Sequence, residues 1–160
     1  MTDWTDWEPN IRANLLFLLR GDEVLLIRKK RGIGAGKINA PGGKIEPGET
    51  AEQGAIRETI EEVGLTATNL SEMGELHFQF VDGMALHCTV FHSEFFEGEA
   101  IETDEAIPIW TKIADIPYDE MWEDDIHWLP RALAGEIFRG YFEFDDDKML
   151  SQQLEFTTRS

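Results

Sequence analysis

The stretch of residues 42–65, GGKIEPGETAEQGAIRETIEEVGL, constrains the fold of this chain more than any other part of it. Paired glycines open the stretch and make its backbone permissive. A helical pattern then begins at Thr50 and runs to about Val63, and Gly64 follows as a residue typical of helix C-caps. We therefore predict a glycine-containing loop that leads into one helix.

Three carboxylates share one face of this predicted helix. At about 100° per residue, Glu58, Glu61 and Glu62 fall within one sector of the helical wheel. The opposite side carries three apolar residues, Ile56, Ile60 and Val63. We expect the apolar face to dock on a sheet while the acidic face stays open. The helix alone allows two interpretations: an ordinary acidic helix, or a cluster of hard oxygen ligands for Mg²⁺ or Mn²⁺.

Strand patterns surround this helix. The strand candidates are residues 15–19, 23–28, 76–81, 84–91, 107–111, 141–144 and 149–156. The first two runs predict a β-hairpin, and the next two predict another around Asp82-Gly83. Residues 124–133 predict a second helix, with a possible kink at Pro130. Strands with two helices among them predict an α/β fold, in which helices cover the faces of a sheet.

The composition limits the partners of the chain. Its 160 residues predict a single domain, with residues 1–12 as an N-terminal extension. Acidic residues outnumber basic ones 32 to 14, for a net charge of -18, which opposes binding to a nucleic acid polymer. The same charge also suits a protein adapted to high salt. With neither a membrane-length apolar run nor a signal-peptide pattern, we expect a cytoplasmic monomer that makes no membrane contact.

The spacing of the whole stretch at residues 42–65 separates the two interpretations of the acidic helix. Its fixed positions are Gly43, Glu49, Arg57, Glu58, Glu61, Glu62, Gly64 and Leu65. This spacing resembles the Nudix box, the defining motif of the Nudix hydrolases. Thr59 departs from the box, where the family usually has an aliphatic residue. The resemblance implies an α/β/α sandwich around a mixed β-sheet, and cleavage of a nucleoside diphosphate linked to another group.

The resemblance also implies roles for individual residues. It assigns catalysis to Arg57, Glu58, Glu61 and Glu102, and metal binding to Gly42, Glu58, Glu61, Glu62 and Glu102. The metal would be Mg²⁺, with Mn²⁺ as an alternative, and it would neutralise charge on the phosphates. Glu61 and, from outside the box, Glu102 are the candidates for the base that activates water. Arg57 is expected to pair with Glu49 and to hold the loop against the helix.

A second resemblance concerns the substrate. The segments KKRGIGAGKIN, FQFV, MWEDDIHWLP and FRGYFEF are similar to the vertebrate Nudix enzymes that hydrolyse oxidised purine nucleoside triphosphates, and the likeness spans about residues 15–156. It implies conversion of 8-oxo-dGTP or 2-hydroxy-dATP to the monophosphate and pyrophosphate, and so nucleotide-pool sanitation. The chain departs from that pattern at Ile33, Ile38, Leu86 and Glu123, which bears on base preference.

By position, this second resemblance implies nine substrate-binding residues: Asn14, Lys29, Asn39, Phe78, Phe80, Leu86, Trp122, Asp124 and Asp125. Asn39 would bond the purine and Trp122 would stack on it. Two adjacent carboxylates in a confined pocket do not easily ionise together. Asp124 and Asp125 would then offer a donor and an acceptor to the purine edge. The alternatives are that the Asp pair caps a helix, and that Trp122 and especially Trp128 are core residues.

Two other functions are compatible with the motif. One is a Nudix hydrolase for another nucleotide derivative, such as ADP-ribose or a dinucleoside polyphosphate. The other is a Nudix-fold module that binds nucleotides without cleaving them, although a sensor has no need of the intact acidic set at residues 58–62. Cys88 is the one cysteine, so no internal disulfide forms, and we expect it to be a small buried residue.

Overall fold

A curved mixed β-sheet organises the protein, and a computed structural model describes it over residues 2–158. Its strand order is β11-β10-β6-β7-β1-β2-β3, with β4 paired to β1, β9 paired to β2, and a separate β5–β8 pair. The strands are β1 (Ile11–Arg20), β2 (Glu23–Lys29), β3 (Ile38–Asn39), β4 (Gly42–Lys44), β5 (Thr66–Thr68), β6 (Ser71–Phe80), β7 (Ala85–Ser93), β8 (Phe95–Glu97), β9 (Ala106–Lys112), β10 (Glu136–Asp145) and β11 (Lys148–Thr158). The helices are α1 (Ala51–Val63) and α2 (Asp125–Leu133), with 3-10 turns at Ile113–Asp115 and Tyr118–Glu120.

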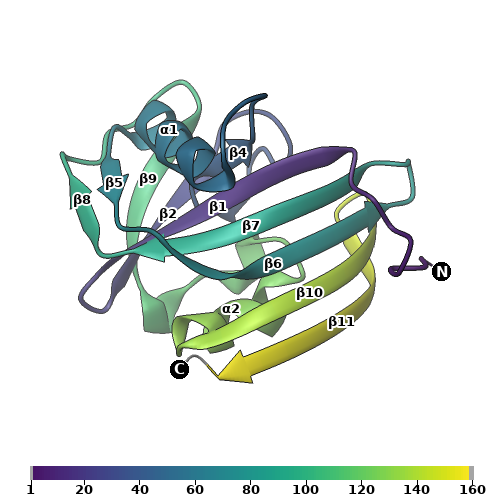
Figure 1. Ribbon diagram of the computed structural model, residues 1–160. Helices are drawn as coiled ribbons and strands as arrows, with labels where there is room; N and C mark the ends of the chain where they lie inside the picture. The colour runs from purple at the N-terminus through teal and green to yellow at the C-terminus, as the bar shows by residue number, and fades with distance from the viewer. Residues whose placement is uncertain (1, 159–160) are drawn as a thin grey trace.

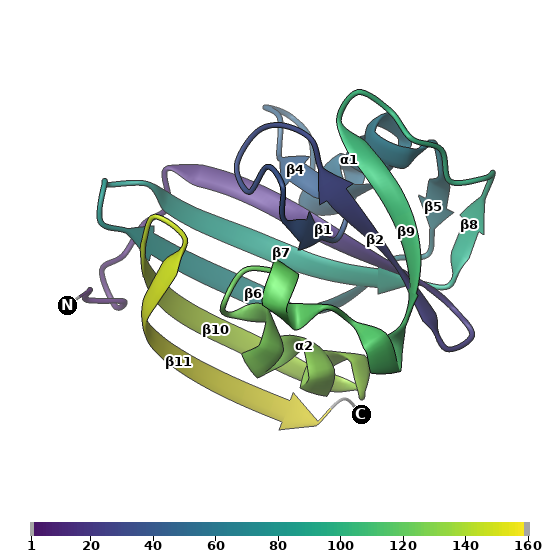
Figure 2. The same cartoon turned by 180° about the vertical axis from the view of Figure 1, so that it is seen from behind.

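The two helices cover opposite faces of the sheet, as Figures 1 and 2 show from front and back. Successive side chains of β1 point to opposite faces of the sheet, so the strand contributes to two hydrophobic cores. Leu16 and Leu18 pack in the cluster that contains α1 residues, and Phe17 packs in the cluster that contains α2 residues. The predicted α/β/α sandwich around a mixed sheet is therefore confirmed. Neither helix is long and apolar enough to cross a membrane.

The longer predicted elements are confirmed, including both hairpins and the second helix. Residues 11 and 12, which we assigned to an N-terminal extension, belong instead to β1. The short strands β3, β4, β5 and β8 were not predicted. Each has only two or three residues, which is too few for an alternating pattern to show.

Helix α1 begins and ends where its capping residues predict. Thr50 and Gln53 form a reciprocal capping box, and Gly64 adopts a left-handed conformation (φ 77°) that ends the helix. Our assignment of its faces was wrong in two respects. Ile60 is 45% exposed, and Glu62 is only 2% exposed. Small residues, not large apolar ones, form most of the buried side, because the helix packs closely against β1 and β4.

Strands β1 and β2 separate soon after the turn that joins them. Their register holds only at Leu19↔Val24 and Arg20↔Glu23, next to the turn. Farther along, β4 pairs with β1 through Asn14↔Gly43, while β2 pairs with β3 and β9. The split leaves room between the two halves of the sheet, and a cavity opens there.

Phe142 provides a test of the core beneath this cavity. It is fully buried on β10 and stacks on Phe78 with ring centroids 5.5 Å apart. We expect Phe142→Ala to lower the free energy of unfolding by about 3–5 kcal/mol in urea denaturation, because it leaves a cavity in packed surroundings. Leu150→Ala, at a position 53% exposed, is the matched control and should change it by less than about 0.5 kcal/mol. A loss below about 1 kcal/mol for Phe142→Ala would contradict the core described here.

Candidate functional site

Strand β4 lies directly against the acidic side of α1. The Gly42 amide donates to Glu62 Oε1 (2.9 Å), and the Gly43 amide donates to Asn14 Oδ1 (3.3 Å). A Cβ atom at Gly43 would lie 2.7 Å from the carboxyl carbon of Glu58, and one at Gly42 would lie 2.1 Å from the Asn14 carbonyl oxygen. Gly42 is therefore required for the close pairing of β4 with β1, and Gly43 leaves room for the Glu58 carboxylate against β4.

Glu58 and Glu62 form a carboxylate cluster with Glu105, in which one oxygen of each residue lies within 4.8 Å of the other two. Burial raises the pKa of Glu62 to about 8, against the opposing effect of the Gly42 amide. Burial also raises the pKa of Glu58, although the Arg57 hydrogen bond counteracts it. The carboxylates of this cluster repel one another when they are ionised. A hard divalent cation such as Mg²⁺ or Mn²⁺ would offset this repulsion and would bind their oxygens.

The other two acidic residues predicted as ligands lie outside this cluster. Glu61 has a side chain 49% exposed and pairs with Arg57 (3.2 Å). Glu102 has a side chain 58% exposed and pairs with Lys30 (2.5 Å). Glu105, which we did not predict, occupies the third position. The acidic run at residues 102–105 pointed to this loop, but no periodic pattern in it says which carboxylate faces the helix.

Arg57 joins the loop to the helix, as predicted. Its guanidinium donates twice to Glu49, from Nε (3.0 Å) and from Nη2 (2.7 Å). This hydrogen bonding lowers the pKa of Glu49 to about 2. The same group donates to the Lys44 carbonyl (3.1 Å) and to Glu58 (3.0 Å). Arg57 therefore holds β4, the following loop and the carboxylate cluster together, and is not placed as a metal ligand.

A cavity of about 360 Å³ opens on the other side of β4. All nine predicted substrate-binding residues line it: Asn14, Lys29, Asn39, Phe78, Phe80, Leu86, Trp122, Asp124 and Asp125. Lining residues that we did not predict for the site include Ile11, Ile33, Leu76 and Met84, as well as Cys88, which is buried as expected. Gly42, Gly43 and Lys44 form its β4 wall, so the cavity and the carboxylate cluster share one boundary.

Asp124 and Asp125 lie at the start of α2 and are almost fully buried. Trp128 Nε1 donates to Asp124 Oδ2 (2.9 Å), while Asp124 Oδ1 and Asp125 Oδ2 have no hydrogen-bond partner. Asp124 occupies the N-cap position of α2, as the helix-cap alternative expects, but its side chain makes no cap hydrogen bond. Trp128 is a core residue, as we expected, and stacks on Phe138 (4.6 Å).

The Asp pair is poised to share a proton. Burial raises the pKa of Asp124 to about 6, although the Trp128 hydrogen bond favours its ionised form. Burial, together with the neighbouring Asp124 charge, raises the pKa of Asp125 well above its usual range. The pair therefore favours a state with one proton, in which one carboxyl can donate a hydrogen bond and the other can accept one.

Aromatic rings surround the cavity near this pair. Trp122 meets Phe80 and Phe144 edge-on, with ring centroids 6.2 and 5.6 Å away. Lys37 Nζ lies 5.2 Å from the centre of the Trp122 ring. Phe78 continues the apolar wall. A flat aromatic group could lie among these rings and direct its polar edge to Asp124 and Asp125.

Comparison with known proteins gives a consistent result. The NUDIX domain family matches residues 9–132. The chain is 45% identical over 145 residues to an oxidized purine nucleoside triphosphate hydrolase of Danio rerio, covering 88% of this chain and 92% of that one. It is 40% identical over 144 residues to the Mus musculus protein described in the same words, covering 88% and 91%. The crystal structure of a mutator MutT protein from Bacillus halodurans superposes with a TM-score of 0.80 at 27% identity, covering 91% and 97%.

The position of Glu105 leads to a prediction about metal binding. We expect Glu105→Gln to weaken Mn²⁺ binding, followed by electron paramagnetic resonance, by about 10-fold or more, because it removes one oxygen donor of the cluster. Glu102→Gln is the matched control and should change the affinity by less than about 3-fold, because Glu102 pairs with Lys30 instead. The reverse pattern would show that Glu102, and not Glu105, completes the cation site.

The buried Asp pair leads to a prediction about pH. Asp124 has a pKa above its unfolded value of 3.8, so the folded state holds its proton more tightly. The stability from this group is complete below about pH 3.8 and is lost as the pH rises through about 6. The asparagine of Asp124→Asn cannot ionise, so the variant should not lose this stability. As the pH rises from 4 to 7, the unfolding free energy of the variant should increase by about 1–3 kcal/mol relative to that of the native protein. Equal pH dependence of the two proteins would contradict the raised pKa.

Proposed function

Because this chain belongs to the NUDIX domain family, we propose that it is a divalent-metal-dependent hydrolase of oxidised purine nucleoside triphosphates. Its products would be the nucleoside monophosphate and pyrophosphate, with 8-oxo-dGTP and 2-hydroxy-dATP as the substrates. The observation that carries the proposal is one continuous cavity bounded by the Asp124–Asp125 pair and by β4, which lies against the carboxylate cluster.

The Asp pair would read the base. One carboxyl of the pair would carry a proton and donate while the other accepts, through the unpartnered Asp124 Oδ1 and Asp125 Oδ2. A guanine-like and an adenine-like edge differ in the order of donors and acceptors. Transfer of the proton from one carboxyl to the other would therefore allow both edges to bind. Trp122 would hold the ring plane by stacking, which does not depend on the identity of the base.

The β4 side of the cavity would hold the phosphates. Lys29 lines the cavity, and its charge acts on Glu62, so a cationic side chain lies between the two parts of the site. A divalent cation held by Glu58, Glu62 and Glu105 would neutralise the charge of the phosphates. Without it, the clustered carboxylates would repel a triphosphate.

The proposed reaction is hydrolysis of the phosphoanhydride between the α- and β-phosphates. A water oxygen bonds to a phosphorus of the anhydride between the α- and β-phosphates, the bridging bond at that phosphorus breaks, and the nucleoside monophosphate and pyrophosphate separate. The water proton passes to a carboxylate. Glu61 and Glu102 remain our candidates for this base. Each forms an ion pair in the structure, Glu61 with the Arg57 side chain and Glu102 with the Lys30 side chain.

We further propose Mg²⁺ as the physiological metal, and nucleotide-pool sanitation by a cytoplasmic monomer. The chain would form a single domain that acts on small molecules and binds neither membranes nor nucleic acid polymers. A net charge of -18 supports the expected lack of membrane and nucleic acid binding, because it repels phosphate backbones and anionic lipid surfaces unless cations intervene.

Turnover of four nucleotides with Mg²⁺ tests the proposal: 8-oxo-dGTP, 2-hydroxy-dATP, dGTP and ADP-ribose, with the released phosphate species identified. We expect pyrophosphate release, with kcat/KM highest for the two oxidised purines. Preference for ADP-ribose or for dGTP would refute the substrate assignment and leave the metal-dependent chemistry standing. Tight binding without turnover at saturating Mg²⁺ would instead identify a sensor.

Substitution of the Asp pair locates the specificity. We expect Asp125→Ala to lower kcat/KM for the oxidised purines by about 100-fold or more, because the base edge then loses a buried partner. Asp119→Ala, in the exposed 3-10 turn before α2, is the matched control and should leave kcat/KM unchanged. An Asp125→Ala variant that folds and keeps its preference would show that the base is read elsewhere.

A further inference from the structure

Two histidines and a glutamate come together on the sheet face that points away from the cavity. Along β6, Leu76 and Phe78 line the cavity, so Glu75 and His77 project from the other side. His87 on β7 is the direct cross-strand partner of His77. Three potential metal ligands therefore come from adjacent positions of one antiparallel pair, on a face that plays no part in the proposed hydrolysis.

The ligand atoms of these residues are close together. One ligand atom of each of Glu75, His77 and His87 lies within 4.8 Å of the other two. His87 Nε2 is 2.9 Å from Glu75 Oε1, and the two imidazole centroids are 5.0 Å apart. A cation at this point would need only small side-chain adjustments, because both strands already hold the groups in place.

The chemical state of His77 suits a ligand. Its Nδ1 lies 2.9 Å from the Gly140 carbonyl, to which only a protonated nitrogen can donate. The neutral ring then keeps a lone pair on Nε2. Burial lowers the pKa of His77 and favours this neutral form. Histidine ligands of metals commonly donate their second ring nitrogen to a backbone carbonyl in this way.

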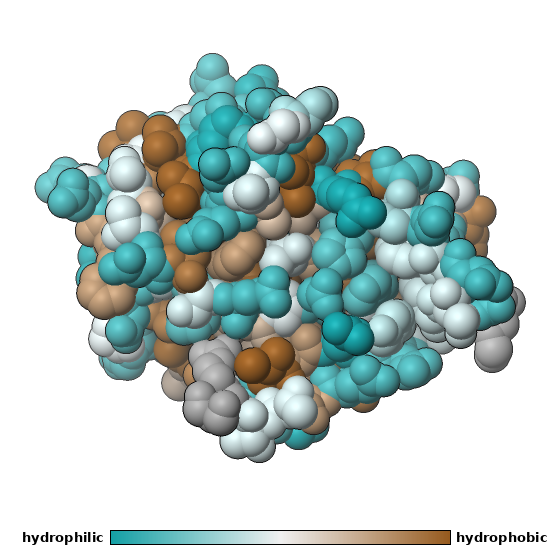
Figure 3. Space-filling view, in the orientation of Figure 1, coloured by the Kyte–Doolittle hydropathy of each residue, from teal (hydrophilic) through white to brown (hydrophobic). Residues whose placement is uncertain are grey.

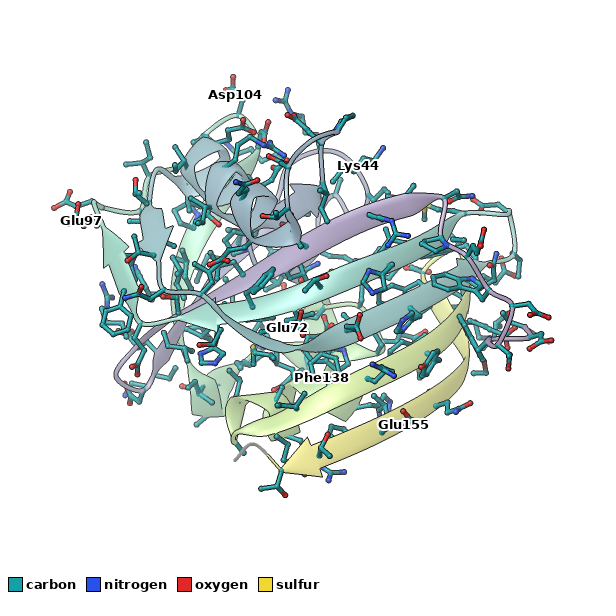
Figure 4. The ribbon with its side chains drawn as sticks, viewed as in Figure 1. Lys44, Glu72, Glu97, Asp104, Phe138 and Glu155 are labelled. Atoms are coloured by element: carbon teal, nitrogen blue, oxygen red, sulfur yellow. The ribbon has the colours of Figure 1, made fainter. Side chains whose placement is uncertain are left out.

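Glu75, His77 and His87 are each half-buried, and other acidic residues lie near Glu75. A hollow of about 290 Å³ borders Glu75, and two of its acidic lining residues, Glu72 and Glu155, are labelled in Figure 4. Arg139 Nη2 is 3.2 Å from Glu75 Oε2, so it orients the carboxylate and also balances one charge. Figure 3 shows that this side of the molecule is mostly hydrophilic.

We propose that Glu75, His77 and His87 form a second cation site, selective for Zn²⁺ over Mg²⁺ and Ca²⁺. Imidazole nitrogens favour borderline transition metals, whereas the all-oxygen cluster on α1 favours hard cations. In the bound state the ion would replace the direct contact between His87 Nε2 and Glu75 Oε1. The ion would link β6 to β7 beneath Trp7, whose ring meets His77 edge-on at 5.5 Å.

Zn²⁺ titration by calorimetry, with millimolar Mg²⁺ present throughout, tests the site. We expect His77→Gln and His87→Gln each to weaken one Zn²⁺ site by about 10-fold or more. His127→Gln, an exposed histidine on α2, is the matched control and should bind Zn²⁺ as the native protein does. Circular dichroism and Mg²⁺-supported hydrolysis confirm that the variants fold. Unchanged Zn²⁺ affinity in both cluster variants would overturn the proposal.

Co²⁺ as the probe separates this site from the carboxylate cluster. A Co²⁺ ion with imidazole ligands and low coordination number absorbs visible light strongly, whereas one in an all-oxygen, six-coordinate site absorbs weakly. We expect strong bands that Zn²⁺ abolishes and that His87→Gln lacks. Weak bands alone, unaffected by His87→Gln, would place all bound cation at the carboxylates and refute the site.

Discussion

The close approach of β4 to α1 is the constraint on which the rest of the site depends. Gly42 and Gly43 allow the strand backbone to touch the carboxylates of the helix, and Arg57 holds it there through Glu49 and the Lys44 carbonyl. The same strand forms one wall of the cavity. A substrate phosphate on one side of β4 and a cation on the other would therefore be separated by little more than a backbone.

The protein buries acid at both boundaries of this cavity, by different means. At β4, Glu62 is almost fully buried and favours its protonated form unless a cation arrives. At α2, a shared proton relieves the charge repulsion between Asp124 and Asp125, and the indole N–H of Trp128 donates a hydrogen bond to Asp124. One boundary is thus suited to a metal and the other to a hydrogen-bonded base edge. Asp124 and Asp125 are almost fully buried, which strengthens the electrostatic interactions of this pair.

Much of this was predictable from the sequence, and the failures have physical causes. The pattern of residues 42–65 indicated α1 and its C-cap at Gly64, and the resemblance to the Nudix box implied the Arg57–Glu49 pair. Resemblance over most of the chain indicated all nine predicted cavity residues. A helical wheel could not show which parts of the fold surround α1. These surroundings bury Glu62 as well as the small residues of the helix. Nor could spacing choose between Glu102 and Glu105, because loop geometry decides which of them faces the helix.

The cavity also depends on strands beyond the part of the chain that the NUDIX family match covers. That match ends at residue 132, yet Phe142 and Phe144 of β10 support Phe78, Phe80 and Trp122 from behind. Residue 147, in the turn that follows, reaches back to Lys37. The β10–β11 hairpin thus shapes the aromatic side of the cavity. Evolution could alter that hairpin to change which ring is accepted while the phosphate chemistry is inherited intact.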